Sequence, residues 1–115
     1  MAITQYASGN ETVSTTEWSL TTDTSGPDVQ TDDGMYQFWL DLNALAKGDL
    51  YIFRVYEKVL SSGTQRIVFQ AFFANAQSEP IWVSPALILL HGWDATIVKS
   101  AGADASIDFS VRQIT

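Results

Sequence analysis

The chain has 115 residues, no cysteine, and a formal net charge of −7 from 13 acidic and 6 basic residues. Its length suits a single domain, and the lack of cysteine excludes disulfides and thiolate metal sites. The acidic balance argues against nucleic-acid and anionic-lipid partners, because both need clustered basic side chains. The first residues carry no secretory signal pattern, and no apolar run approaches the ~20 residues of a membrane helix. We therefore expect a soluble protein made without signal-peptide export.

The first third of the chain is rich in Thr, Ser, Asp and Gly. We expect one early strand over about residues 12–20, followed by a loop around the SGP sequence at residues 25–27. Four carboxylates lie in this loop region: Asp23, Asp28, Asp32 and Asp33. Because their spacing lacks the ligand pattern of a calcium-binding loop, we interpret them as an acidic loop exposed to solvent.

From residue 35 onward apolar and polar residues alternate, which predicts half-buried β-strands. In residues 35–42 the apolar face carries Tyr36, Phe38, Leu40 and Leu42. One helical turn is expected over residues 43–48. Residues 49–60 and 65–76 then flank the turn sequence SSGT and form the clearest predicted β-hairpin. Its apolar faces carry Tyr51, Phe53, Val55 and Val59 on the first arm, and Ile67, Phe69, Ala71 and Phe73 on the second.

The most apolar stretch is PIWVSPALILLHGW, at residues 80–93. Its two prolines, Pro80 and Pro85, exclude a continuous helix. We expect one bent strand or two, with one face on the core and the other open to a partner or a covering loop. The closing segments 93–100 and 106–114 alternate again as strands. The count of about seven or eight antiparallel strands predicts an all-β, single-domain β-sandwich over residues 12–115, with either immunoglobulin-like or jelly-roll topology.

Catalytic patterns are absent from the sequence. His91 is the only histidine, and the chain contains no G-x-S-x-G nucleophile elbow. One histidine without cysteine does not supply the usual zinc ligands. Glu57 shares a strand face with Phe53 but has Arg66 on the adjoining hairpin arm, which favours a salt-bridged residue over a glycosidase acid. We expect a non-enzymatic protein with no cofactor or metal.

The tryptophans indicate an interaction surface instead. Trp39 and Trp82 fall out of phase with their apolar neighbours, so we expect them to face outward. Exposed tryptophans on a β-sandwich stack on sugar rings in carbohydrate-binding modules, or anchor protein interfaces. We favour the protein interface, with Trp39, Trp82, Leu87 and Leu89 as its candidate residues.

Four stretches of the chain resemble small structural proteins of tailed bacteriophages: DGMYQFWLDLNALAKGDLYIFRVYEKV, SGTQRIVFQ, PIWVSPALILLHGWDATI and SIDFSVRQI. The resemblance covers about residues 17–114. Proteins of this kind are similar to capsid decoration, or cement, proteins, which sit on the assembled head as trimers and lock neighbouring capsomers together. The resemblance implies a homotrimer that binds the major capsid protein on the capsid surface of a virion assembled in the bacterial cytoplasm.

Decoration proteins often use an N-terminal arm, and the resemblance implies such an arm over residues 1–11. Its candidate contact residues are Ala2, Ile3 and Tyr6. Two alternatives stay open at this point: a carbohydrate-binding β-sandwich module, and a component of the phage tail or connector.

Overall fold

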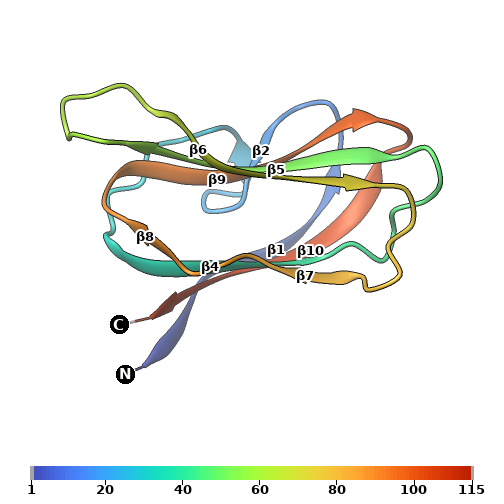
Figure 1. Cartoon of the computed structure of the whole chain (residues 1–115), viewed down its shortest axis with the longest axis horizontal. Helices are drawn as coiled ribbons and strands as arrows, with labels where there is room; N and C mark the ends of the chain where they lie inside the picture. The colour runs from blue at the N-terminus through green and yellow to red at the C-terminus, as the bar shows by residue number, and fades with distance from the viewer. Residues whose placement is uncertain (1, 115) are drawn as a thin grey trace.

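The computed structural model describes residues 2–114, which form ten β-strands in two antiparallel sheets stacked face to face (Figure 1). Sheet A, the lower one in Figure 1, has the order β1 (Ile3–Val13), β10 (Ala105–Ile114), β4 (Gly34–Asp41) and β7 (Ile81–Val83), and β8 (Leu87–Leu89) also pairs with β4. Sheet B has the order β3 (Thr24–Ser25), β2 (Trp18–Ser19), β9 (His91–Ala101), β5 (Leu50–Lys58) and β6 (Arg66–Ala74). The predicted all-β sandwich is confirmed.

The strand pairings are nested along the chain. β5 pairs with β6, β4 with β7 and β8, β2 with β9, and β1 with β10, so each pair encloses the one before it. The strands β1, β2, β4 and β5 alternate between the two sheets. This winding is that of a jelly roll. In an immunoglobulin-like sandwich the first two strands share a sheet, whereas β1 and β2 lie in different sheets here.

The core lies between the inner faces of the two sheets. Its buried side chains include Tyr36, Phe38 and Leu40 of β4, Tyr51, Phe53 and Val55 of β5, Trp93, Ala95 and Ile97 of β9, and Ile107, Phe109 and Val111 of β10. The apolar faces predicted for these four strands therefore line the core, except for Val59, which follows β5 and is exposed. Because burial of a large apolar side chain stabilises a fold by roughly 1.5–3 kcal/mol, this shared layer holds the sheets together.

The N-terminal segment differs from its expectation. An arm is expected over residues 1–11, but residues 3–11 belong to β1, which pairs with β10 from Ile3 to Val13 with one register shift between Gln5 and Ala7. The expected strand over residues 12–20 is also wrong, since β1 ends at Val13 and β2 covers only Trp18–Ser19. The segment 3–12 carries few apolar residues because it is an edge strand with one face in solvent, so its alternation is weak. Met1 and Thr115, at the ends of the expected arm and sandwich, lie outside the described residues.

The acidic loop is fastened to sheet B by Asp94 of β9, which is fully buried. Its two carboxylate oxygens accept hydrogen bonds from Thr21 Oγ1 (2.6 Å) and from the backbone N–H of Asp28 (2.7 Å). Asp28 is half-buried and the other three loop carboxylates are exposed. Within residues 2–114 no group of three or more His, Asp or Glu side chains is placed to hold a metal ion.

Two further features concern helices. Residues 43–48 form hydrogen-bonded turns, from Leu45 N–H to Leu42 and from Asp49 N–H to Ala46, in place of the expected helical turn. Among residues 2–114 there is no helix long and apolar enough to cross a membrane.

Candidate interaction surface

One side of the sandwich is formed by the edge strands β6 of sheet B and β7 and β8 of sheet A, and we call it the open side. It faces the viewer in Figure 1. Trp82 of β7 joins the two edges across the interior. Its ring centroid lies 5.1 Å from that of Phe73 and 6.4 Å from that of Phe69, both on β6. This aromatic cluster fixes the two edges next to each other.

The strands and turns around the open side carry most of the large apolar side chains that the fold leaves in solvent. Among the described residues twelve such side chains are exposed, and nine of them lie between residues 59 and 90. These nine are Val59, Leu60, Ile67, Val68, Phe72, Ile81, Val83, Ile88 and Leu90. Ile81, Val83 and Ile88 pair with outer-face residues of β4 and therefore lie on the outer face of sheet A, whereas Phe72 pairs with Ile52 on the outer face of sheet B. Single exposed apolar residues are ordinary, but several close together on neighbouring strands are typical of an interaction surface.

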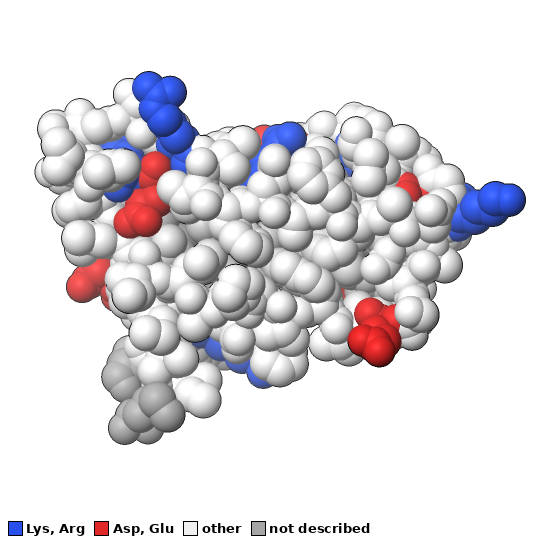
Figure 2. Space-filling model, viewed as in Figure 1, with Lys and Arg blue, Asp and Glu red and all other residues white. Residues whose placement is uncertain are grey.

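Charge is nearly missing from the same side. The strands β6, β7 and β8 contain one charged residue, Arg66 at the start of β6, although the chain as a whole carries 19 charged residues. Figure 2, in the view of Figure 1, shows uncharged atoms over most of this side and charged side chains mainly toward its rim. Low charge at the centre and charge at the rim is the pattern of protein interfaces.

The tip of the β5–β6 hairpin extends the open side at one end. Val59 is 89% exposed there, and it lines a hollow of about 400 Å³ together with Leu60, Ile67 and Val68. A register shift between β5 and β6 places Ile67 opposite Tyr56 and leaves Val68 unpaired, as a β-bulge does. Because of this bulge, two consecutive apolar residues are exposed to solvent.

Leu87 and Leu89, two of the residues expected to form the interface, face the core. Leu89 is 2% exposed and Leu87 is half-buried against the core, whereas Ile88 between them is 78% exposed. Pairing with β4 explains the difference, because Leu87 lies opposite the buried Tyr36 and Ile88 lies opposite Met35 on the outer face. A shift of one residue exchanges every side chain between the faces of a strand.

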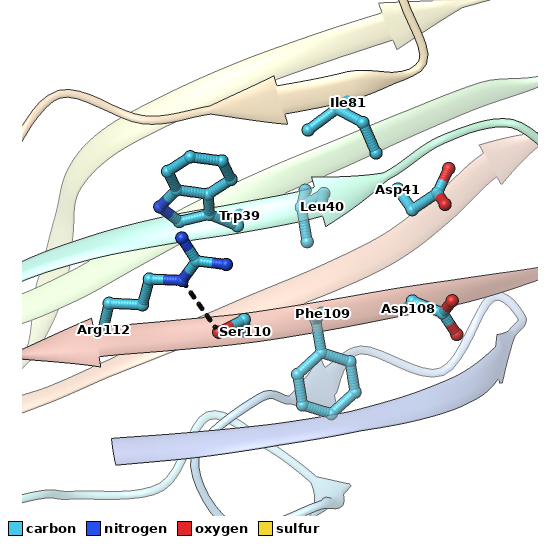
Figure 3. A pocket seen from close by; sticks show the side chains of 8 residues that line it. All are labelled: Trp39, Leu40, Asp41, Ile81, Asp108, Phe109, Ser110 and Arg112. Atoms are coloured by element: carbon cyan, nitrogen blue, oxygen red, sulfur yellow. Dashed lines mark hydrogen bonds between the residues drawn. The ribbon is translucent and has the colours of Figure 1, made fainter. Parts of the chain in front are cut away.

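Of the two tryptophans expected to face outward, Trp82 points inward into the aromatic cluster described above. Trp39 does lie on the outer face of sheet A and is half-buried. The guanidinium of Arg112 stacks over its ring, 3.9 Å from the ring centroid. A hollow of about 170 Å³ lies beside them, lined also by Ile81, Asp41 and Asp108 among others (Figure 3). Because Arg112 occupies one face of the ring, Trp39 offers a poor platform for a sugar.

The candidate residues of the N-terminal segment separate into two groups. Ala2 and Ile3 are exposed where β1 begins. Tyr6 instead packs on the core, with its ring 5.3 Å from Tyr36 and its hydroxyl donating to Asp32 Oδ2 (2.6 Å). Burial, followed by the hydrogen bond to Asp32, raises the pKa of Tyr6 above its ordinary value. Tyr6 therefore holds β1 to the acidic loop and is not available as a contact of a free arm.

Glu57 has a structural role. One of its oxygens accepts hydrogen bonds from the backbone N–H groups of Leu90 (2.6 Å) and His91 (3.1 Å). Glu57 is the register partner of Arg66 on β6, as the expected salt bridge would need, but its Oε2 is engaged by the chain between β8 and β9. It thus ties the end of β5 to the start of β9.

Sequence reasoning missed the exposed residues of β6. The sequence nevertheless indicates them through two runs of consecutive apolar residues, Ile67-Val68-Phe69 and Phe72-Phe73. Consecutive residues on a strand point to opposite faces, so one apolar residue of each neighbouring pair must face outward.

The fold places the chain in the class of all-β jelly-roll domains. No family model matches the sequence, and no curated protein matches it. A solved chain from the structure titled "Bacillus endospore appendages form a novel family of disulfide-linked pili" is similar to it, with a TM-score of 0.50, 16% identity, and coverage of 96% of this chain and 87% of that chain. At this identity the likeness shows a shared fold alone.

Proposed function

We propose that the protein is a non-enzymatic structural protein of a tailed-bacteriophage virion, a decoration protein that binds the assembled capsid through the exposed apolar residues of β7 and β8. The observation that supports this function is the presence of three exposed apolar residues, Ile81, Val83 and Ile88, on two strands that contain no charged residue. A soluble acidic protein keeps such a surface when a partner covers it. The resemblance to small virion proteins supplies the kind of partner, the major capsid protein.

The contacts would be non-covalent. The similar solved chain belongs to disulfide-linked pili, but this chain has no cysteine and cannot be cross-linked in that way. Apolar burial would have to supply the binding free energy, at roughly 25 cal/mol per Å² before the costs of association are subtracted.

The test uses virions made without this protein and then incubated with purified variants. Ile88→Asp places a charge on the outer face of β8 at a position 78% exposed, so the fold should be kept while head binding is lost. Ile3→Asp is the matched control, because it charges an exposed apolar residue on the opposite edge of sheet A. Undiminished binding of Ile88→Asp to heads would contradict the proposal. If Ile3→Asp alone lost binding, the contact with the capsid would lie on β1 instead.

Copy number separates head from tail. Quantitative mass spectrometry of purified particles should find hundreds of copies, as expected for a protein that covers the head. A dozen or fewer copies would contradict decoration and support a neck or tail component.

A further inference from the structure

The edge of β6 that points away from β5 is exposed and apolar. Within residues 2–114, β6 pairs with β5 alone. Its sequence, RIVFQAFFA, has no proline or lysine, and these are the residues that commonly protect edge strands from pairing with another chain. Phe72 is 59% exposed on this strand. A nine-residue edge of this kind is ready to accept another strand.

The other sheet edges are less suitable. β1 is longer but polar, with Thr, Gln, Ser, Asn and Glu along its length. β7 and β8 have three residues each and are separated by Pro85, and β3 has two residues. Short or polar edges pair weakly with other chains, so β6 is the edge to consider.

We propose that β6 pairs antiparallel with β6 of a second copy, about a two-fold axis through Ala71, which joins two five-stranded B sheets into one sheet of ten strands. An axis perpendicular to the sheet keeps the core faces of both copies on the same side. Each residue must therefore lie opposite a partner residue of the same orientation. This condition allows axes through a residue of β6 and excludes axes between two residues.

The regular part of the strand selects the axis. The bulge at Val68 and the positive φ of Asn75 (65°) interrupt the strand on either side of residues 69–74. An axis through Gln70 would bring the bulged Val68 opposite Phe72 of the partner subunit. An axis through Phe72 would bring Phe69 opposite Asn75 of the partner subunit. The axis through Ala71 keeps all pairs within the regular segment 69–73.

The same register makes β6 complementary to itself. Phe69 lies opposite Phe73 of the partner subunit, so the aromatic clusters around Trp82 in the two copies become continuous. Aromatic cross-strand pairs stabilise sheets, and the small Ala71 at the axis leaves space between the flanking rings. Arg66, the strand's single charge, lies outside the paired segment, so no like charges meet. These features favour a second copy of this chain over an unrelated strand.

A single cysteine tests the register, because the natural chain has none. Ala71→Cys should form a disulfide-linked dimer under diamide, since a residue on the axis faces its own copy at a Cα distance of roughly 4.5–5.5 Å, which a disulfide accepts. Ala7→Cys is the matched control: the same substitution, also half-buried, on the opposite edge strand β1. Equal cross-linking of both variants would overturn the pairing, and stronger cross-linking of Gln70→Cys would overturn the register.

Analytical ultracentrifugation over a dilution series tests the dimer itself. The natural chain should approach twice its 12.7 kDa mass at high concentration. Phe72→Lys should stay at the monomer mass with its melting temperature kept, whereas Ile3→Lys, on β1, should still dimerise. A monomer at every concentration, or the trimer that the phage resemblance implies, would overturn the inference. These measurements use purified protein only, so their outcome does not depend on the proposed role in a virion.

Discussion

Asp41 of β4 and Asp108 of β10 are direct cross-strand partners on the outer face of sheet A (Figure 3). Each has a hydrogen-bond donor of its own. The backbone N–H of Asn43 donates to Asp41 Oδ1 (3.1 Å), and Asn10 Nδ2 donates to Asp108 Oδ1 (2.6 Å). Like charges directly opposite each other weaken an antiparallel pair, so this position lowers the stability of the sheet.

Asp41→Asn should therefore raise the free energy of unfolding by ~0.2–1 kcal/mol. The asparagine carbonyl oxygen can still accept from the backbone N–H of Asn43, so the charge is the main change. Urea denaturation in low salt measures the gain, which should shrink in high salt because ions screen exposed charges. Asp104→Asn is the control and should give no gain, because Asp104 pairs with Lys99 (2.5 Å). A gain for Asp41→Asn that salt leaves unchanged would exclude repulsion as its cause.

The orientation of β8 predicts opposite effects for two neighbouring residues. Leu89→Ala should lower the free energy of unfolding by ~2–4 kcal/mol, because Leu89 is buried in the core and its removal leaves a cavity. Ile88→Ala should change it by less than ~0.5 kcal/mol, because its side chain is in solvent. Chemical denaturation of the monomer checks both. Equal losses, or the reverse order, would mean that β8 is shifted by one residue against β4.

Substitutions at two glycines with similar backbone angles distinguish the cost of backbone strain from the cost of a steric clash. Gly48 and Gly102 have φ angles of 93° and 91°, which L-residues adopt at a cost of about 1–2 kcal/mol. A Cβ on Gly48 would meet nothing within 4 Å, but one on Gly102 would lie 2.1 Å from Asp49 Oδ1. Gly102→Ala should therefore lower the melting temperature clearly more than Gly48→Ala. Equal shifts in the two variants would contradict the close approach of Asp49 to this turn.

Asp49 predicts a dependence of stability on acid pH. Its carboxylate accepts hydrogen bonds from the backbone N–H groups of Ala46 (2.8 Å) and Ala103 (2.9 Å), and these bonds lower its pKa. The unfolded chain, with a pKa of about 3.9, then binds the proton more readily than the folded one. The stabilisation is complete above pH ~4 and is lost as the pH falls through the folded pKa.

The measurement compares the natural chain with Asp49→Asn in urea at several pH values. The difference in free energy of unfolding should be largest near neutral pH and should narrow below pH ~4. Asp33→Asn, at an exposed position, controls for the general loss of one negative charge. A difference of constant size across the acid range would show that the ionised form of Asp49 gives no advantage.

The sequence predicts the sandwich through the strands whose two faces differ in polarity. In β4, β5, β9 and β10 the alternation identifies the apolar residues that face the core, such as Phe38 and Phe53, although Asp94 and Thr96 on the other face of β9 are buried as well. In the stretch ALILL no polar residue marks the outer face, so its orientation depends on pairing with β4, about 50 residues away in the chain. Strand order likewise depends on distant partners, so the jelly roll could not be separated from an immunoglobulin-like sandwich by periodicity.

The sequence predicts that apolar residues are exposed in the second half of the chain, but it does not identify which residues these are. Surplus apolar residues in the second half of the chain predict an interface there, and nine of the twelve exposed large apolar side chains among the described residues lie between residues 59 and 90. The exposed residues include Ile88 and Phe72 instead of Leu89 and Trp82, because the pairing register and the aromatic cluster behind β6 decide which side chains remain in solvent.

The nested pairing also sets an order in which the chain folds. Residues 59–65 are all that separates β5 from β6, whereas β1 and β10 meet only after residues 14–104 have been enclosed. The entropy lost on closing a loop grows with the length of the loop. We therefore expect the β5–β6 hairpin to nucleate folding and β1 to pair with β10 last. Substitutions in β1 should then accelerate unfolding and leave the refolding rate nearly unchanged, which the two arms of a chevron plot would report.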